Sequence, residues 1–237
     1  MQANQAKTVV LLSGGMDSAV CAAFAVRDFG AANIAGLHVS YGQRTEARER
    51  GSFEAICSRL GIRRQMVLRN DVLGRIGGSA LTDTAIAIPE AGKESKIGGH
   101  IPVTYVPFRN AHFLAAAVSW AEVLGASNIY IGAVEQDSSG YPDCRPAYYT
   151  AFNEVIRAGT KEGGIKVVTP LIALRKAEIV RLGLEVGAPF DLTWSCYSQE
   201  ERACGACESC VLRLRAFEQA GVADPIPYAR QAVSQSF

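Results

Sequence analysis

The sequence predicts an α/β protein with an open, mostly parallel sheet, helices on both faces, and a small cysteine-rich region toward its C-terminal end. Short apolar runs alternate with longer segments of helical periodicity, which is the pattern of parallel strands joined by crossover helices. Four of the seven cysteines crowd into residues 196–210. We therefore expect an α/β domain at 1–190 and a metal-binding region, packed on it, at 191–237.

Each element is expected where an apolar run or a helical pattern begins and ends. The expected strands lie at 8–12, 33–40, 63–68, 128–134 and 165–170. The expected helices lie at 16–30, 45–61, 110–126, 175–187 and 208–221, with a further helix that ends at residue 159. Gly30, Gly61 and Gly125 are expected to end their helices, because glycine adopts the backbone conformation that stops a helix.

Two stretches are expected to be surface structure. The helix that begins at Thr45 is highly charged, and we expect Arg48 and Glu49 on its solvated outer face, with no functional role. Residues 71–105 have no helical or strand pattern and form a longer connection than is typical. Their composition, rich in Gly, Ser and Thr, leaves open whether this loop is a substrate lid or a surface insertion.

Charge and hydropathy exclude several classes. The chain has 24 basic and 23 acidic side chains, so no nucleic-acid partner is expected from net charge. The first residues lack the pattern of a signal peptide, and the longest apolar stretch, 111–126, is interrupted by Ser119 and Glu122. We expect no membrane segment and a cytoplasmic protein, in which clustered cysteines favour metal binding over disulfides.

A glycine-rich turn between the first strand and the first helix is the candidate nucleotide site. Its glycines let backbone amides approach phosphate oxygens, its serines add hydroxyls, and the helix N-terminus favours negative charge. The turn lacks the lysine and the spacing of a Walker loop, so it is suited to hold a pyrophosphate rather than to transfer a γ-phosphate. The expected ATP-binding residues are Leu12, Ser13, Gly14, Gly15, Met16, Asp17, Ser18, Ala19 and Val20. A purely structural turn is the alternative.

The cysteine-rich region has the spacing of a metal site. Cys196, Cys204, Cys207 and Cys210 follow the pattern C-x7-C-x2-C-x2-C. Four thiolates complete a tetrahedral zinc site and leave no position for an activated water, so the expected zinc is structural, one per chain. An iron–sulfur cluster is the competing interpretation, although the x7 gap is not a common ferredoxin spacing.

The other cysteines carry separate expectations. Cys21 and Cys57 lie on apolar helical faces and are expected in the core. Cys144 stands beside Arg145, whose charge could lower the thiol pKa, so a nucleophilic role is a minority hypothesis for this residue.

The motif S-G-G-x-D-S resembles the signature of the PP-loop ATP pyrophosphatases, with the adenine nucleotide alpha hydrolase-like fold. This family cleaves ATP between the α and β phosphates and passes AMP to a substrate oxygen. The resemblance implies that the loop holds pyrophosphate, that Asp17 lies near Mg²⁺, and that Lys176, in "PLIALRKAEIV", points to the phosphates. Arg109, in "VPFRN", could meet phosphate or carboxylate in a bidentate fork. Solvated surface positions are the alternatives for both cations.

Four motifs together resemble one family, the 7-cyano-7-deazaguanine synthases of queuosine biosynthesis: "SGGMDS", "VPFRN", "GAVEQDSSGYPDCRP" and "WSCY" with "CGACESC". The family segment usually reads V-P-G-R-N, so Phe108 here replaces a glycine. The resemblance implies an ATP-dependent ligase that forms carbon–nitrogen bonds. It adenylates 7-carboxy-7-deazaguanine, lets ammonia form an amide, and converts that amide to a nitrile. A homodimer is also implied.

The loop around "EQDSSGYPDC" is the candidate substrate-recognition element. Glu135, Asp137 or Asp143 could accept hydrogen bonds from a guanine-like edge, and Tyr141 could stack on the ring. The alternative is that these residues serve only to form a turn.

Two other functions stay open. A PP-loop tRNA thiolase, or another adenylating amide-forming enzyme, would share the loop and the sheet. A zinc-ribbon interaction module with an idle nucleotide fold is the non-enzymatic alternative.

Overall fold

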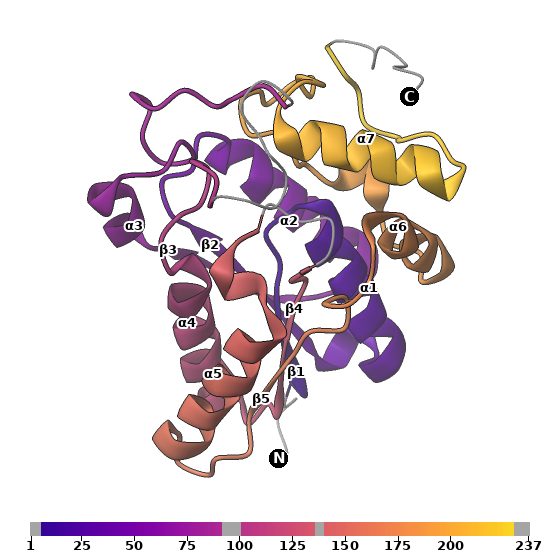
Figure 1. The fold of residues 1–237 in the computed structure, drawn as a ribbon. Helices are drawn as coiled ribbons and strands as arrows, with labels where there is room; N and C mark the ends of the chain where they lie inside the picture. Colours follow the sequence, from indigo (N-terminus) through magenta and orange to yellow (C-terminus); the bar gives the residue numbers. More distant parts are fainter. Residues whose placement is uncertain (1–5, 92–100, 136–139, 230–237) are drawn as a thin grey trace.

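The sheet is entirely parallel and has the predicted α/β architecture. A computed structural model describes residues 6–91, 101–135 and 140–229 (Figure 1). Within these residues the strand order is β3-β2-β1-β4-β5. The strands are β1 Thr8–Leu11, β2 Ile34–Ser40, β3 Arg64–Arg69, β4 Asn128–Ile131 and β5 Lys166–Val168. The predicted fold class is confirmed.

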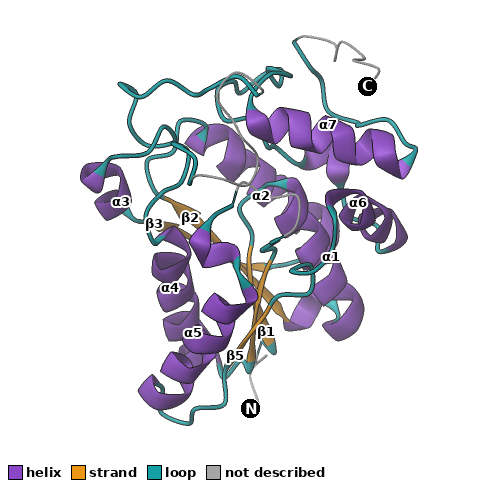
Figure 2. Cartoon of the chain, viewed as in Figure 1, coloured by secondary structure: helices purple, strands orange, loops and turns teal. Residues whose placement is uncertain are grey.

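Helices cover both faces of the sheet (Figure 2). One face packs against α1 Met16–Phe29, α2 Glu46–Leu60, α6 Lys176–Glu185 and α7 Glu208–Ala220. The other packs against α4 Arg109–Leu124 and α5 Pro146–Gly159. Because side chains alternate along a strand, β1 sends Val10 into the first layer and Val9 into the second. Both layers are built on the central strand.

Most expected boundaries agree with the structure to within a few residues. Gly30, Gly61 and Gly125 each follow a helix with positive φ, as predicted. The expected loop at 71–105 begins instead with a short helix, α3 Asp71–Ile76, whose first turn is capped because the Asn70 side chain accepts the Val72 amide at 3.2 Å. Three short 3-10 helices complete the described elements: η1 Ala31–Asn33, η2 Pro142–Cys144 and η3 Phe190–Leu192.

The cysteine-rich region shares a hydrophobic core with the sheet domain. Helix α7 lies along α6, and Phe217 packs edge-on against Phe190 with ring centroids 5.1 Å apart. Both rings belong to the same buried cluster as β1 and α1. Within the described residues, no helix has both the length and the apolar character needed to cross a bilayer.

The strand order reverses between β1 and β4, and ligands bind such sheets at the carboxyl ends of the strands beside this reversal. Backbone segments approach one another very closely there. A Cβ atom at Gly132, directly after β4, would lie 2.7 Å from the Asp17 carbonyl oxygen and 2.8 Å from the Ser18 nitrogen. The strand end therefore supports the turn after β1 only because residue 132 has no side chain.

We expect Gly132→Ala to lower the free energy of unfolding by about 1–3 kcal/mol, because the added methyl group forces the β4 end away from the turn. Gly164→Ala is the matched control, since a Cβ there meets no atom within 4 Å. Urea denaturation of both variants measures the difference. Equal effects at the two positions would contradict the close approach.

Candidate functional site

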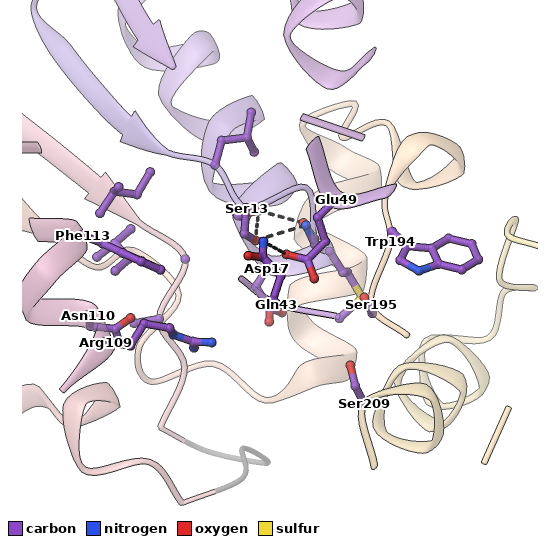
Figure 3. A pocket seen from close by; sticks show the side chains of 18 of the residues that line it. Ser13, Asp17, Gln43, Glu49, Arg109, Asn110, Phe113, Trp194, Ser195 and Ser209 are labelled. Atoms are coloured by element: carbon purple, nitrogen blue, oxygen red, sulfur yellow. Dashed lines mark hydrogen bonds between the residues drawn. The ribbon is translucent and has the colours of Figure 1, made fainter. Parts of the chain in front are cut away.

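A cavity of about 290 Å³ opens at the carboxyl ends of β1 and β4 (Figure 3). Its walls come from the turn after β1, the first turns of α1, α2, α4 and α6, the segment 194–197, and the start of α7. Side chains from distant parts of the chain therefore face one space.

The turn after β1 is organised by its own serines. The hydroxyls of Ser13 and Ser18 lie 3.0 Å apart, the Gly15 amide donates to Ser13 Oγ at 3.2 Å, and Ser18 Oγ donates to the Gly15 carbonyl at 2.9 Å. Helix α1 begins at Met16, so the amides of its first residues lack helical acceptors. The site has the groups that an anion needs.

Three of the nine expected nucleotide residues do not line this cavity. Ala19 and Val20 are fully buried, and the Ala19 amide donates to the Gly15 carbonyl at 3.0 Å. The Ala19 amide is therefore paired with the backbone and is not directed at the cavity. Gly14 contributes through packing, since its carbonyl accepts the Trp194 amide at 2.8 Å. The other six expected residues line the cavity: Leu12, Ser13, Gly15, Met16, Asp17 and Ser18. Their contact with nucleotide stays a prediction.

Lys176 brings to the turn the cation that the turn itself lacks. It is the first residue of α6, and its Nζ lies 2.6 Å from Asp17 Oδ2. The side chains are 15% and 27% exposed, respectively, so the pair is open to the cavity yet partly shielded. Asp17 Oδ1 is buried and has no hydrogen-bond partner among the described residues. A cation would satisfy this oxygen.

Arg109 faces the cavity from the start of α4. Its Nη1 donates to the Tyr41 hydroxyl at 3.0 Å, and its guanidinium carbon lies 5.5 Å from the Tyr41 ring, 5.8 Å from Phe113 and 5.9 Å from Tyr141. Its Nε is buried without a hydrogen-bond partner in the described chain. Aromatic rings hold this cation in place and leave donors for an anion.

Phe108, in the segment "VPFRN", adopts a backbone conformation that is typical of glycine. Its φ is 57°, in the left-handed region, and it is the residue immediately before α4. Its ring is 59% exposed and meets Tyr148 edge-on at 6.3 Å. The left-handed conformation of Phe108, which precedes Arg109, costs about 1–2 kcal/mol in local backbone strain because phenylalanine has a Cβ atom.

Glu49 does not lie on the solvated outer face where it was expected. It lines the cavity, and its two carboxylate oxygens accept hydrogen bonds from Thr45 Oγ1 at 2.8 Å and Gln43 Nε2 at 3.0 Å. Burial raises its pKa, while these two donors act to lower it. Arg48, beside it, stacks on Trp194 with 4.6 Å between the guanidinium carbon and the ring centroid.

A sequence signal for Glu49 was present. Positions 49, 53, 56 and 57 follow helical spacing, and the last three are the buried core residues of α2. A carboxylate on the apolar side of a helix is a candidate functional residue, because burial of a charge is unfavourable without a compensating role.

The expected substrate-recognition residues separate into two groups. Tyr141 lines the cavity, and its hydroxyl donates to Thr104 Oγ1 at 3.0 Å. Asp143 and Glu135 do not line it. Asp143 instead anchors its loop to α4, because its Oδ2 accepts the Asn110 amide at 3.0 Å and its carbonyl accepts Asn110 Nδ2 at 2.9 Å. Asp137 lies outside the described residues.

Cys144 lines the cavity, but the pKa of its thiol is raised, whereas the nucleophile hypothesis needs a lowered pKa. Burial raises its pKa to about 11, assisted by the charge of Asp143, and the positive charges of Arg109 and Lys176 only partly oppose this. A thiol with that pKa is almost fully protonated at neutral pH. Cys21 and Cys57 are buried in the core, as predicted.

The four C-terminal cysteines form a cluster that could hold a metal ion. Their sulfur atoms all lie within 4.8 Å of one another. Cys204 Sγ and Cys210 Sγ are 3.8 Å apart, close to the sulfur separation of a tetrahedral site with metal–sulfur bonds of about 2.3 Å. Backbone amides of Cys204 and Cys207 donate to the sulfurs of Cys196 and Cys204 at 3.4 and 3.3 Å. The described residues thus fit a four-thiolate metal centre.

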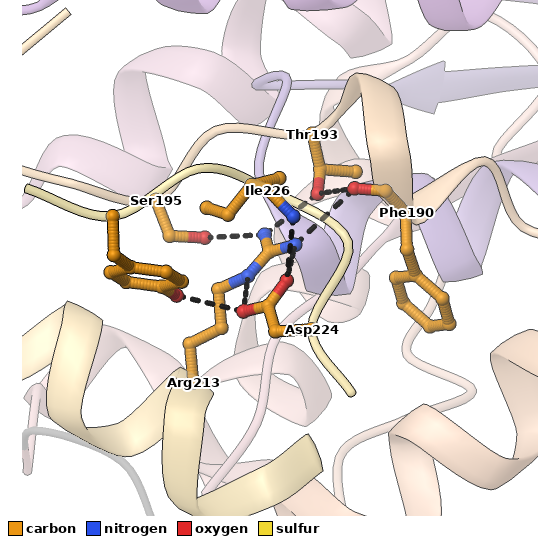
Figure 4. A network of polar contacts seen from close by, with 7 residues as sticks. Phe190, Thr193, Ser195, Arg213, Asp224 and Ile226 are labelled. Carbon is orange, nitrogen blue, oxygen red and sulfur yellow. Dashed lines mark hydrogen bonds and ion pairs between the residues drawn. The ribbon is translucent and has the colours of Figure 1, made fainter. Parts of the chain in front are cut away.

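A buried ion pair between α7 and Asp224 is linked by polar contacts to Thr193 and Ser195 beside the cavity (Figure 4). Arg213, on α7, is 2% exposed and meets Asp224 through two hydrogen bonds, of 2.7 and 2.9 Å. Its Nη1 donates to Thr193 Oγ1 at 2.7 Å and to Ser195 Oγ at 3.3 Å. Ser195 lines the cavity. The helix that carries Cys210 therefore also fixes the strip of chain beside the nucleotide turn.

Known proteins resemble this chain over almost its whole length. The family described as "Queuosine biosynthesis protein QueC" matches residues 7–221. The chain belongs to the QueC family.

Curated relatives are highly similar to this QueC chain. A 7-cyano-7-deazaguanine synthase from Koribacter versatilis is 70% identical over 223 residues, which cover 94% of this chain and 93% of that protein. One from Acidobacterium capsulatum is 68% identical over 232 residues, 98% of this chain and 100% of that protein. One from Chlorobium chlorochromatii is 59% identical, covering 94% and 96%. The resemblance seen in the motifs is confirmed.

A solved structure of NMN synthetase from Francisella tularensis aligns with 98% of this QueC chain and 90% of that protein, at 11% sequence identity and a TM-score of 0.46. A similarity at this level carries nothing about activity.

We expect alkylation of Cys144 by iodoacetamide to rise steadily between pH 7 and pH 9.5 without reaching a plateau, because its thiolate form appears only near the raised pKa. Mass spectrometry of the peptide containing residue 144 gives the rate at each pH. Cys144→Ala is expected to keep full turnover. A plateau below pH 8, or a variant without turnover, would restore the nucleophile hypothesis.

Proposed function

We propose that this chain catalyses the ATP-dependent conversion of 7-carboxy-7-deazaguanine and ammonia to 7-cyano-7-deazaguanine, through an adenylated carboxylate and an amide. The observation that carries the proposal is its identity of 70% and 68% with two proteins named 7-cyano-7-deazaguanine synthase, over nearly all of each chain. Its membership of the QueC family places it in queuosine biosynthesis. The cavity geometry supports the same chemistry.

In the first half-reaction, a carboxylate oxygen attacks the α-phosphate of ATP, and pyrophosphate leaves. The amides and hydroxyls of the turn around Ser13 and Ser18 hold the leaving pyrophosphate, and Lys176 and Arg109 neutralise charge at the α-phosphate. Asp17 Oδ1, which is buried and has no hydrogen-bond partner in the described part of the chain, is suited to bind Mg²⁺. Bound Mg²⁺ would neutralise phosphate charge. Asp17 also keeps Lys176 beside the turn through the 2.6 Å contact.

In the second half, ammonia attacks the acyl adenylate, AMP leaves, and the amide forms with release of a proton. A second ATP adenylates the amide oxygen and releases pyrophosphate. Loss of AMP and of the remaining N–H protons then leaves the carbon–nitrogen triple bond. Two ATP molecules are used for each nitrile, and one set of turn, lysine and arginine contacts serves both adenylations.

The four-cysteine centre has a structural role in this proposal. We propose that Cys196, Cys204, Cys207 and Cys210 bind one Zn²⁺. Its role is structural, because a four-sulfur shell leaves no open coordination position for a reacting water. Residues 191–237 then form a metal-stabilised region on the domain of residues 1–190. We further propose a cytoplasmic homodimer whose partners are the deazapurine, ATP and ammonia, with no nucleic acid.

A PP-loop tRNA thiolase is less well supported. That reaction needs a sulfur-carrying cysteine or an iron–sulfur cluster, together with a basic RNA surface, and the near-neutral net charge argues against such a surface. Cys144, which lines the cavity, has a raised pKa. An idle fold with a zinc-ribbon function would give the Asp17–Lys176 pair and the free Arg109 donors no role.

The proposal predicts two AMP and two pyrophosphate for each 7-cyano-7-deazaguanine formed from 7-carboxy-7-deazaguanine, ATP, Mg²⁺ and ammonium. Mass spectrometry of bases and nucleotides measures the ratio. Asp17→Asn is expected to lower kcat/KM by about 100-fold or more, because it removes a charge beside the reacting phosphate. Asp28→Asn, at the far end of α1, where Asp28 pairs with Arg27, is the control. ADP and phosphate as products, or no nitrile or amide, would overturn the proposal.

Elemental analysis of purified protein is expected to find one zinc per chain and no acid-labile sulfide. Cys204→Ser is expected to lose the metal and to lower the melting temperature, because metal binding contributes directly to folding. Cys144→Ala, which leaves the cluster intact, is expected to retain the full zinc content. Iron with stoichiometric sulfide would instead assign an iron–sulfur cluster.

A further inference from the structure

The cavity contains few groups able to recognise a purine-like base by its donors. Among its described lining residues, the carboxylates are Asp17 and Glu49. Asp17 is engaged with Lys176 beside the phosphate turn. Glu49 is the carboxylate without an ion-pair partner in the described residues.

Neighbouring neutral groups fix the Glu49 carboxylate in position. Thr45 Oγ1 donates to one oxygen and Gln43 Nε2 to the other. Gln43 is itself held, because its Oε1 accepts the Tyr41 amide at 2.8 Å. A carboxylate has about four lone-pair positions, so each oxygen keeps the capacity for a further donor. Glu49 is therefore an oriented acceptor with unused capacity on a cavity wall.

The surroundings of Glu49 suit a flat, uncharged ring. Tyr41, Leu81, Phe113 and Tyr197 line the same cavity and offer aromatic or apolar surface. The facing charges are Arg109, whose attraction lowers the Glu49 pKa, and Glu46, whose repulsion raises it. In the described chain Arg109 forms no salt bridge with Glu49, so its influence acts across a distance. Charge-assisted hydrogen bonds from a ligand would offset the cost of keeping a carboxylate in this place.

We infer that Glu49 recognises the guanine-like edge of the deazapurine, with its two oxygens accepting from the ring N1–H and the 2-amino group. This inference rests on the proposed function and deepens it by assigning a specificity-determining residue. The edge of adenine offers one donor, its amino group, beside an acceptor nitrogen, so the same carboxylate would be poorly matched to the base of ATP. Glu49 thus distinguishes the substrate from the nucleotide.

The test compares two proteins with two substrates. Wild type and Glu49→Gln are assayed with 7-carboxy-7-deazaguanine and with its analogue that lacks the 2-amino group. Glutamine preserves the size of the side chain and can still accept from Gln43 and donate to Thr45. We expect Glu49→Gln to lower kcat/KM for the natural base by about 100-fold, mainly through KM, with KM for ATP changed less than about threefold.

The analogue separates recognition from general damage. Wild type is expected to lose about 30-fold in kcat/KM when the 2-amino group is absent, whereas Glu49→Gln is expected to lose less than about threefold, because the substitution replaces one of the two paired acceptor oxygens by a donor and removes the negative charge. Glu46→Gln is the control: the same substitution in the same helical turn, at a residue that does not line the cavity.

Three results would overturn the inference. They are wild-type indifference to the 2-amino group, equal discrimination by wild type and Glu49→Gln, and a rise in KM for ATP rather than for the base. The comparison of the two bases with wild type needs no variant, so a folding defect of Glu49→Gln does not affect this part of the test. If wild type makes no amide or nitrile from the natural base, the proposed function itself fails.

Discussion

The site depends on the close approach of three backbone segments around the turn at residues 13–18. Gly132 reaches Asp17 and Ser18 from β4, and Trp194 donates its amide to the Gly14 carbonyl at 2.8 Å. A side chain at Gly14 would collide with the carbonyl of Glu49 on α2, and its φ of 93° is itself a glycine conformation. The absence of side chains at two positions lets the sheet, α2 and the C-terminal region meet at one point. Asp17, which pairs with Lys176, lies in this contact.

The cysteine-rich region belongs to this arrangement and is not an appendage to it. The chain that enters the cluster, residues 193–196, passes directly beside the nucleotide turn. Thr45 Oγ1 donates to the Cys196 carbonyl at 3.4 Å, and Arg213 holds Thr193 and Ser195 from the opposite side. The cysteine cluster therefore helps to determine where one wall of the cavity stands, because Cys196 belongs both to the cluster and to this segment.

The sequence predicted those features that depend on local pattern. Periodicity located the strands and the long helices, and the spacing of four cysteines located the metal cluster. The short helix α3 was missed because six residues with an internal glycine leave no periodic signal. The roles of Glu49 and Asp143 were missed for another reason: one faces a cavity and the other anchors α4, and both depend on partners distant in the chain. Long-range contacts between polar groups leave little trace in composition.

The wide sequence separation of the contacts at the nucleotide turn has a consequence for the order of folding. Asp17 and Lys176 are 159 positions apart, and Thr45 and Cys196 are 151 apart. During synthesis the turn emerges early, whereas Lys176 and Trp194, which contact it, emerge only after all five described strands. Loop closure over such distances is slow, so the sheet is expected to form before the turn is enclosed. A nascent chain would thus expose the turn for most of its synthesis, and the last elements to be made enclose it.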